Sequence, residues 1–374
     1  MRTVVPPPKK VQGEKSFFSE DEVTLEMQPP YKVLIVDDSS LMRQLLAEIL
    51  SSDPDLEVIG TAGDPFVARE KIKALNPDVL TLDIEMPRMD GLTFLEKLMR
   101  GHPMPVVMIS SLTERGADVT LRALDLGAVD YVSKPRLDVS NGTLELSRDI
   151  IAKVKTAARA RVQALRQAPS GAPEQVGGGH HFSATHKIVA IGASTGGTEA
   201  LKDLLSPLPA DFPGIVIVQH MPEAFTRQFA ERLDAACRIR VHEAKDGDRI
   251  LPGHALLAPG GHHMAVARRG LENSVRVYRG ERVNRHLPSV DVLFSSCARQ
   301  LGCNVLGVLL TGMGNDGAKG MLEMKQADAF TIAQDEATCV VYGMPREAVL
   351  LGGVDEVLPL GRIPATLVQR LSAR

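Results

Sequence analysis

The 374-residue chain has no tryptophan, only four cysteines and only 4% aromatic residues. So few aromatic side chains argue against a surface that stacks nucleic-acid bases. The cysteines form no Cys-x-x-Cys pair, which predicts free thiols in a reducing compartment. No apolar run approaches the roughly 18 residues of a membrane span, and the Pro- and Lys-rich start lacks the apolar core of a signal peptide. We therefore expect a cytoplasmic protein with no direct membrane insertion.

The chain also lacks a strong excess of charge of either sign. Its net charge of −3 creates no overall basic field, so the composition does not favour nucleic acid as a partner. Apolar residues make up 44% and charged residues 24%, close to the average for soluble globular proteins. At roughly 100–200 residues per domain, the length allows two or three domains.

Changes in composition divide the chain into four parts. Residues 1–30 mix Pro and charged residues without any period, which predicts a flexible tail. Residues 31–147 and 186–374 each alternate short apolar runs with helical spacing, typical of α/β domains. Residues 148–185 hold a basic segment, read as a solvated last helix or as a docking surface, followed by a Pro/Gly-rich flexible linker.

The first α/β region contains five apolar runs that suit buried parallel strands: 32–36, 57–61, 78–82, 105–109 and 129–133. Helical periodicity fills the intervals, as at Leu41, Leu45 and Ile49. The alternation predicts a doubly wound, five-stranded parallel sheet of the flavodoxin-like type.

Polar side chains stand where these predicted strands end. Asp37 and Asp38 end the first strand and Asp83 the third, while Ser110 ends the fourth and Lys134 the fifth. Each alone could be an ordinary cap, but the carboxyl ends of parallel strands converge on one crevice. Clustered carboxylates repel one another and need a cation, and oxygen ligands suit Mg²⁺. Asp83 could then take a phosphoryl group as an acyl phosphate, with Lys134 and Ser110 holding the new oxygens.

These residues carry a family resemblance. The matching motifs are Asp37-Asp38, LDIEMPRMDG (82–91) and Ser133-Lys134-Pro135. Over Tyr31 to about Pro135 the chain resembles the receiver domain of bacterial response regulators. The resemblance implies phosphorylation of Asp83 by a histidine kinase. It also implies Mg²⁺ held by Asp38, Asp83 and the backbone carbonyl of Glu85, with Asp37 in the same acid cluster.

A glycine-rich turn marks the start of the second α/β region. Gly192-Ala193-Ser194-Thr195-Gly196 matches G-x-S-x-G between an apolar strand and a helical stretch. This pattern predicts an exposed Ser194 on a tight turn, where a helix N-terminus favours a developing anion. A phosphate or dinucleotide loop and a plain turn are the rival interpretations. The next predicted strand, 214–219, ends without the acid that would bind a ribose, which lowers the dinucleotide alternative.

Two further residues at strand ends suit the chemistry of a serine nucleophile. His220 ends the strand that follows Ser194, and Asp316 follows the apolar run 305–311. Together the three predict a Ser–His–Asp triad in which His220 is the base and Asp316 orients it. The chain order differs from the Ser…Asp…His order of α/β-hydrolases, so we do not expect that fold.

At this point the resemblance becomes close. The motifs that carry it are GASTGGTEAL (192–201), VQHMP (218–222), LAPGGHHM (257–264), LTGMGNDGA (310–318) and AQDEATCVVYGMP (333–345). From about Tyr31 to Leu371 the chain resembles the protein-glutamate methylesterase family of bacterial chemotaxis, CheB. The departures are the N-terminal tail and Gly261-His262 inside one motif.

The resemblance implies an activity, partners and supporting residues. The expected reaction is hydrolysis of glutamate methyl esters on methyl-accepting chemotaxis receptors to glutamate and methanol, with deamidation of receptor glutamines as a second activity. Hydrolysis needs no cofactor, and the phosphodonor is a chemotaxis histidine kinase of the CheA type. Backbone N–H groups near Thr195 and Met313 are expected to meet the oxyanion, with His263 in a support role.

Alternatives from other classes are a response regulator with a DNA-binding output domain and a non-enzymatic nucleotide-binding module. The first predicts a helix-turn-helix with a basic recognition helix, and the sequence has no such signal. Two complete sites on one chain also suggest that one controls the other. We expect the unphosphorylated receiver to cover the loops that carry Ser194, His220 and Asp316.

Overall fold

The computed structural model describes residues 30–110, 114–134, 143–160, 187–270 and 272–372, together with Val162 and Phe182. The predicted N-terminal tail, apart from Pro30, and most of the predicted linker lie outside the described residues. So does Pro135 of the receiver motif. Among the described residues, no helix is both long enough and apolar enough to span a membrane.

The first α/β unit is a five-stranded parallel sheet in the order β2-β1-β3-β4-β5, as the alternation predicted. Its strands are β1 (Tyr31–Val36), β2 (Leu56–Ala62), β3 (Val79–Asp83), β4 (Val106–Ser110) and β5 (Asp130–Ser133). Its helices are α1 (Ser40–Ser51), α2 (Pro65–Leu75), α3 (Gly91–Gly101), α4 (Glu114–Asp125) and α5 (Thr143–Ala158). The order of the strands reverses at β1 and β3, which leaves a crevice at their carboxyl ends.

Local sequence signals explain where several of these helices begin. Ser39, Asp64 and Asp90 each accept a hydrogen bond from a backbone N–H in the first turn of α1, α2 and α3, respectively. Such caps satisfy donors that a helix N-terminus leaves unpaired. Pro65, at the first position of α2, adds a backbone angle already suited to the helix.

The second α/β unit is a seven-stranded parallel sheet in the order β14-β13-β12-β6-β7-β9-β8. Its strands are β6 (Ile188–Ala193), β7 (Ile215–Gln219), β8 (Arg240–Glu243), β9 (His254–Leu257), β12 (Val305–Leu309), β13 (Phe330–Gln334) and β14 (Glu356–Leu358). Helices are α6 (Gly197–Leu205), α7 (Glu223–Ala236), α8 (Val290–Leu301), α9 (Ala318–Gln326), α10 (Met344–Leu350) and α11 (Ile363–Ser372). A separate antiparallel ribbon joins β10 (His263–Arg269) to β11 (Glu272–Tyr278). The sheet order again reverses beside β6, between β12 and β7.

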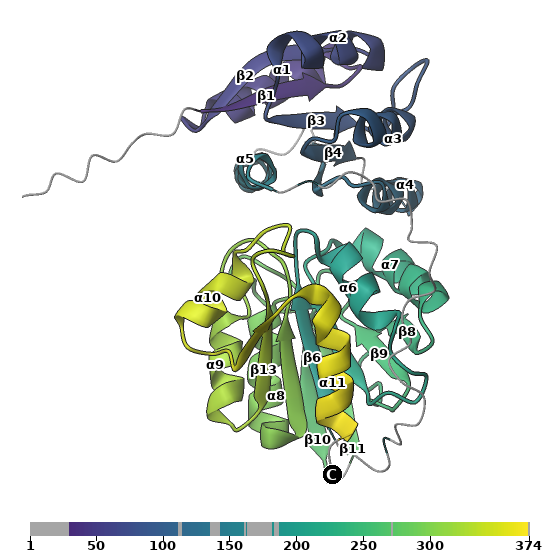
Figure 1. Ribbon diagram of the computed structural model, residues 1–374, viewed down its shortest axis with the longest axis vertical. Coiled ribbons are helices and arrows are strands. Elements are labelled where there is room, and N and C mark those ends of the chain that lie inside the picture. The colour runs from purple at the N-terminus through teal and green to yellow at the C-terminus, as the bar shows by residue number, and fades with distance from the viewer. Residues whose placement is uncertain are drawn as a thin grey trace, which may run out of the picture.

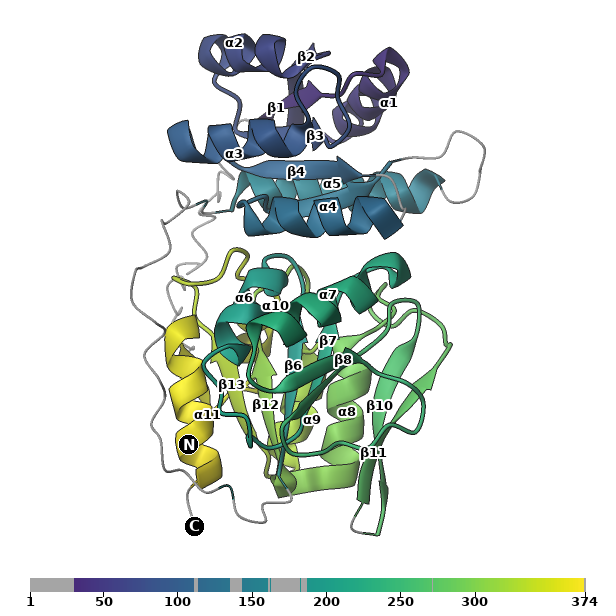
Figure 2. The same ribbon diagram turned by 90° about the vertical axis from the view of Figure 1, so that its right-hand side faces the viewer.

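The first unit lies over the carboxyl ends of the second sheet. In Figures 1 and 2, α4 and α5 form the side of the first unit that faces the second unit, and α4 lies over α6 and α7. The ring of Tyr131 stacks on Phe225, with 4.7 Å between centroids. Arg232 of α7 makes ion pairs with Asp118, at 3.3 Å, and with Asp125. The junction is therefore both apolar and charged, as contacts between domains of one chain commonly are.

Several details differ from the sequence prediction. Leu41 does not join the core: it is 52% exposed, and α1 buries Leu46, Ile49 and Leu50 instead. Residues 148–158, part of the segment expected as a solvated last helix, belong to α5, which packs Ile150 and Val154 into the core of the first sheet. The strands β13 and β14 and the β10–β11 ribbon were not predicted.

Candidate active site

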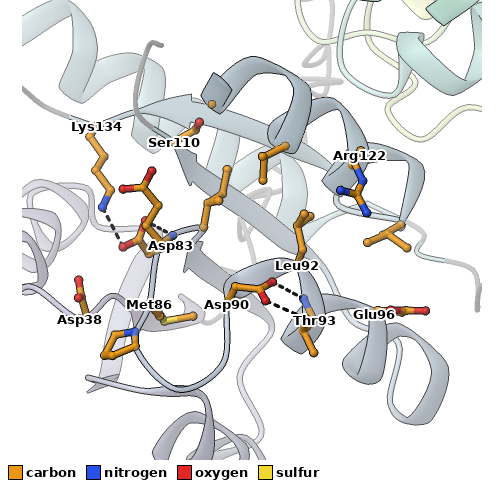
Figure 3. Close-up of a pocket in the computed structure, with 16 residues that line it drawn as sticks. Asp38, Asp83, Met86, Asp90, Leu92, Thr93, Glu96, Ser110, Arg122 and Lys134 are labelled. Atoms are coloured by element: carbon orange, nitrogen blue, oxygen red, sulfur yellow. Dashed lines mark hydrogen bonds and ion pairs between the residues drawn. The ribbon is translucent and has the colours of Figure 1, made fainter. Parts of the chain in front are cut away.

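The first site lies at the carboxyl ends of β1 and β3. These strands are paired neighbours, so Asp37 and Asp83 emerge side by side. Carboxylate oxygens of Asp37, Asp38 and Asp83 all lie within 4.8 Å of one another. The ammonium of Lys134, at the end of β5, lies 2.8 Å from Asp83 Oδ2 and 3.8 Å from Asp37 Oδ2. Figure 3 shows Lys134 and Asp38 on either side of Asp83. All three side chains line a pocket of about 720 Å³.

Burial controls the charge of this pocket. It raises the pKa of Asp83 to about 6, against the opposing effect of Lys134, and it also raises the pKa of Asp37. Asp37 Oδ2 is buried and accepts no hydrogen bond from any described residue. A buried carboxylate oxygen without a donor, beside two more carboxylates, is a donor set that suits a small divalent cation. The residues present therefore fit Mg²⁺.

The remaining predicted residues of this site also border the pocket. The N–H of Glu85 donates to Asp83 Oδ1 over 3.3 Å, and Glu85 lines the pocket. Ser110, at the end of β4, is buried and hydrogen-bonded through its hydroxyl to that of Thr120, 2.7 Å away. Thr120 belongs to α4, the helix whose Asp118 pairs with Arg232 of the second unit. Helix α4 therefore connects the pocket, through Ser110 and Thr120, with the junction between the units, through Asp118 and Arg232.

We expect the stability of the first unit to depend on pH through Asp83. The pKa of Asp83 is raised from 3.8 to about 6 in the folded protein, so the protonated carboxyl stabilises the fold. This stabilisation is complete when the pH is below the ordinary pKa of 3.8. That contribution is lost as the pH rises through about 6. The melting temperature of the wild type should therefore fall more than that of Asp83→Asn between about pH 4 and pH 7. At about pH 7, Mg²⁺ should raise the melting temperature of the wild type and hardly affect Asp83→Asn. Parallel pH and Mg²⁺ responses of the two proteins would contradict this account of the pocket.

The second site lies at the carboxyl ends of β6, β7 and β12. The N–H of His220 donates to Ala193 O over 3.1 Å, and the N–H of Ser194 donates to Thr311 O over 3.0 Å. These backbone bonds place the turn that carries Ser194 between the ends of the other two strands. Gly312 allows the close approach, because a Cβ there would lie 2.7 Å from the Cβ of Ser194. Gly196 adopts a left-handed φ of 76°, which a side chain would strain, at the cap of α6.

His220 and Asp316 form a buried pair beside this turn. Their side chains meet at 2.8 Å between Nε2 and Oδ2, and 7% of the His220 side chain is exposed. The other ring nitrogen, Nδ1, is buried and has no hydrogen-bond partner among the described residues. In the usual serine–histidine–aspartate arrangement the aspartate contacts Nδ1, so the ring here uses its nitrogens in the opposite order. Asp316 thus leaves Nδ1 as the ring nitrogen that is unpaired within the described part of the chain.

Donors from one loop hold the Asp316 carboxylate in place. Asn284 Nδ2 and Ser289 Oγ each donate to Oδ1 over 2.8 Å, and the N–H of Val290 donates to Oδ2 over 2.7 Å. Burial by itself would raise the pKa of Asp316, but the bonds from His220, Asn284 and Ser289 hold it well below its ordinary value. Asp316 thus places a fixed negative charge next to Nε2 of the His220 ring.

The supporting residues expected from the sequence make different contacts. His263 is buried and holds the 281–289 loop: its Nε2 donates to Glu281 O over 2.8 Å, and its Nδ1 accepts from Ser289 N over 3.2 Å. Thr195 and Met313 instead meet the first unit. Thr195 Oγ1 donates to Asp130 Oδ2 over 2.5 Å, and the Sδ of Met313 accepts from the hydroxyl of Thr156 over 2.7 Å.

Family models match both α/β units of the chain. Residues 189–367 match the family model for CheB methylesterase, and residues 33–140 match that for the response regulator receiver domain. A protein-glutamate methylesterase/protein-glutamine glutaminase of Geobacter metallireducens is 60% identical over 348 residues, covering 90% of this chain and 95% of the relative. Proteins with the same activities in their names from Pseudomonas aeruginosa and Salmonella typhimurium are 59% and 58% identical, over 92% and 91% of this chain and 98% and 97% of their own.

The chain belongs to the CheB methylesterase family. It is a response regulator with an esterase of the α/β class as its output, and neither of the non-enzymatic alternatives is supported. The α/β fold predicted for each half, with a parallel sheet in each, is confirmed.

Sequence reasoning missed several residues around the CheB-type site. Gln219 donates through Nε2 to Ser194 O and His220 O, over 2.9 and 3.3 Å, and so ties the two turns together. His286 stacks on His220, and Asn284 and Ser289 bind Asp316. Gln219 stands inside a quoted motif, directly before His220, and this position is the signal that could have found it. The other three lie in a loop without any strand-end signal.

Proposed function

We propose that the chain is a phosphorylation-activated esterase that hydrolyses glutamate methyl esters on methyl-accepting chemotaxis receptors. The observation that carries the proposal is the buried His220–Asp316 pair beside Ser194, in a chain about 60% identical to named protein-glutamate methylesterases. Deamidation of receptor glutamines is the second proposed activity, because the relatives are also named glutaminases and an amide carbonyl can be attacked in the same way. The reaction restores glutamate residues and so serves sensory adaptation in chemotaxis-type signalling.

The proposed catalytic residues are Ser194, His220 and Asp316. Ser194 Oγ attacks the ester carbonyl while His220 Nδ1 takes its proton, and Asp316 stabilises the imidazolium that forms. His220 then gives the proton to the departing methoxide, which leaves as methanol. Water attacks the acyl-enzyme by the same route, with release of glutamate and regeneration of Ser194. Hydrolysis of this kind uses no cofactor.

The tetrahedral oxyanion needs backbone donors. We assign this role to N–H groups near Thr195 and Met313, where each donor is worth roughly 3–4 kcal/mol. His263 acts indirectly: it accepts a hydrogen bond from the backbone of Ser289, whose hydroxyl binds Asp316.

In the receiver, Asp83 is the proposed phosphoryl acceptor. Asp37, Asp38, Asp83 and the backbone carbonyl of Glu85 would hold Mg²⁺, which neutralises the incoming phosphoryl group when bound. Lys134 and Ser110 would grip the phosphoryl oxygens. The proposed phosphodonor is a chemotaxis histidine kinase of the CheA type, and the proposed location of the chain is the cytoplasm.

We assign receiver function to residues 31–147 and catalysis to residues 186–374, with residues 148–185 carrying the rest of α5 and the linker. Contacts between the units support the proposal that the unphosphorylated receiver inhibits the esterase by covering its active site. Asp130 of the receiver and Thr156 of α5 bind Thr195 and Met313, the residues assigned to the oxyanion. A receptor helix and the receiver could not occupy that place together. Phosphorylation would act through Ser110 and its contact with Thr120 of α4, on the interface helix.

Reversal of the charge on Arg232 should release this inhibition. Arg232→Glu would face Asp118 and Asp125 with a like charge, so we expect methanol release by the unphosphorylated chain to rise by about tenfold, which corresponds to roughly 1.4 kcal/mol. Arg227→Glu is the matched control, because Arg227 lies on the same helix and its ion pair, at 4.0 Å, is with Glu243 of the second unit. Equal basal rates for Arg232→Glu and the wild type would show that the α4–α7 contact does not restrain the enzyme.

A serine-directed fluorophosphonate probe separates the esterase from the binding-module alternative. We expect the probe to label Ser194 in the phosphorylated chain. Absence of labelling together with equilibrium binding of a nucleotide would overturn the proposed function.

A further inference from the structure

The loop between β11 and α8 presents a second imidazole to the candidate active site. The rings of His286 and His220 are stacked, with 3.6 Å between centroids and an angle of 6° between planes. None of the roles proposed above involves His286. Beside the hydrogen bond between Nε2 and Asp316, the stacked ring is a second contact that restrains the plane of the imidazole.

The loop is built to hold His286 in this place. Val283 and His286 exchange two backbone hydrogen bonds, of 3.1 and 2.8 Å, across a tight turn. The two residues inside the turn, Asn284 and Arg285, adopt left-handed φ angles of 51° and 70°. Such angles are costly for residues with side chains and persist only where the surroundings impose them. Asn284 supplies that restraint, since its amide binds both Asp316 and Asp291.

The ring of His286 is neutral. Burial is the main cause that lowers its pKa to about 3; the neighbouring His220 contributes to this shift, and Asp316 opposes it. The other charged groups that face it are Lys153 of the receiver and Arg282 of its own loop, and both also lower the pKa. A neutral ring does not repel His220 when that side chain takes up a proton, whereas a second imidazolium at this distance would.

We infer that His286 is a positioning residue for the esterase, which fixes the His220 ring with Nδ1 toward Ser194 and shields one ring face from water. The inference rests on the proposed function and deepens it. Proton transfer from Ser194 requires Nδ1 within hydrogen-bond reach and in line with the hydroxyl. Rotation of the ring about its bond to Asp316 would break that alignment, and a misplacement of about 1 Å can cost 100-fold in rate.

The test compares His286→Ala with His286→Phe in the full-length chain, with a small phosphodonor and Mg²⁺ present. We expect His286→Ala to lower kcat for methanol release by about 10- to 100-fold with little change in KM. His286→Phe keeps a flat neutral ring and should restore kcat to within about threefold of the wild type. The matched control is His242→Ala, on the exposed strand β8.

The possible outcomes distinguish the inference from the function on which it rests. A wild type without methanol release overturns the proposed function itself. An active wild type with an unchanged kcat in His286→Ala overturns only the positioning role. If His286→Ala fails to fold, His286→Phe decides: a folded but inactive Phe variant contradicts positioning by stacking, and an active one supports it. Melting temperatures of all variants identify a folding failure.

Discussion

Ser194→Ala is expected to abolish methanol release from methylated receptors. Loss of the nucleophile of a serine–histidine–aspartate triad typically costs on the order of 10⁶ in kcat. Ser194 is half-buried on the turn between β6 and α6, and its backbone N–H, not its hydroxyl, bonds to Thr311. The substitution removes one oxygen atom and leaves that bond intact. The melting temperature should therefore stay close to that of the wild type.

The measurement is methanol release by the purified variant in the presence of a phosphodonor. A matched control is Ser206→Ala at the C-terminal cap of α6, because the whole helix separates Ser206 from the turn that carries Ser194. If folded Ser194→Ala retained more than a few per cent of the wild-type rate, the assignment of the nucleophile would be wrong.

Asp83→Asn is expected to abolish phosphorylation by a small phosphodonor, and wild-type phosphorylation should require Mg²⁺. An amide cannot form the acyl phosphate, and clustered carboxylates cannot accept a phosphoryl dianion without a compensating cation. The measurement is phosphate incorporation with and without a chelator. Glu96→Gln is the control, because Glu96 lines the same pocket but pairs with Arg100 on its own helix. Incorporation that survives chelation, or persists in Asp83→Asn, would contradict the receiver site.

The sequence was sufficient to predict which residues meet at each sheet edge. Parallel strands bring their carboxyl ends together, so the residues that follow adjacent strands become neighbours in space. Asp37 and Asp83 follow this rule in the first sheet, as do Ser194 and His220 in the second. Long buried strands such as β6 and β12 were visible for the same reason, since they are continuous apolar runs.

Other features depend on contacts that periodicity does not encode. The edge strand β14 has three residues with little burial, so no apolar run marks it. Leu41 has helical spacing with Ile49 but lies at the exposed start of α1. The receiver contacts of Thr195 and Met313 join residues far apart in the chain, and only the docking of one unit on the other creates them. His286 belongs to a loop whose position follows from left-handed backbone angles and from Asn284.

The central claim is that the receiver controls a glutamate methylesterase on the same chain. Methanol release from membranes that contain methylated chemoreceptors, with and without a small phosphodonor and Mg²⁺, tests it most directly. If phosphorylation favours the form with an uncovered active site by about 1.4–2.8 kcal/mol, the rate should be 10- to 100-fold higher when the phosphodonor is present. This increase should be absent in Asp83→Asn, and all release should be absent in Ser194→Ala. Methanol release at the same rate with and without phosphodonor, or no release in either condition, would contradict the account.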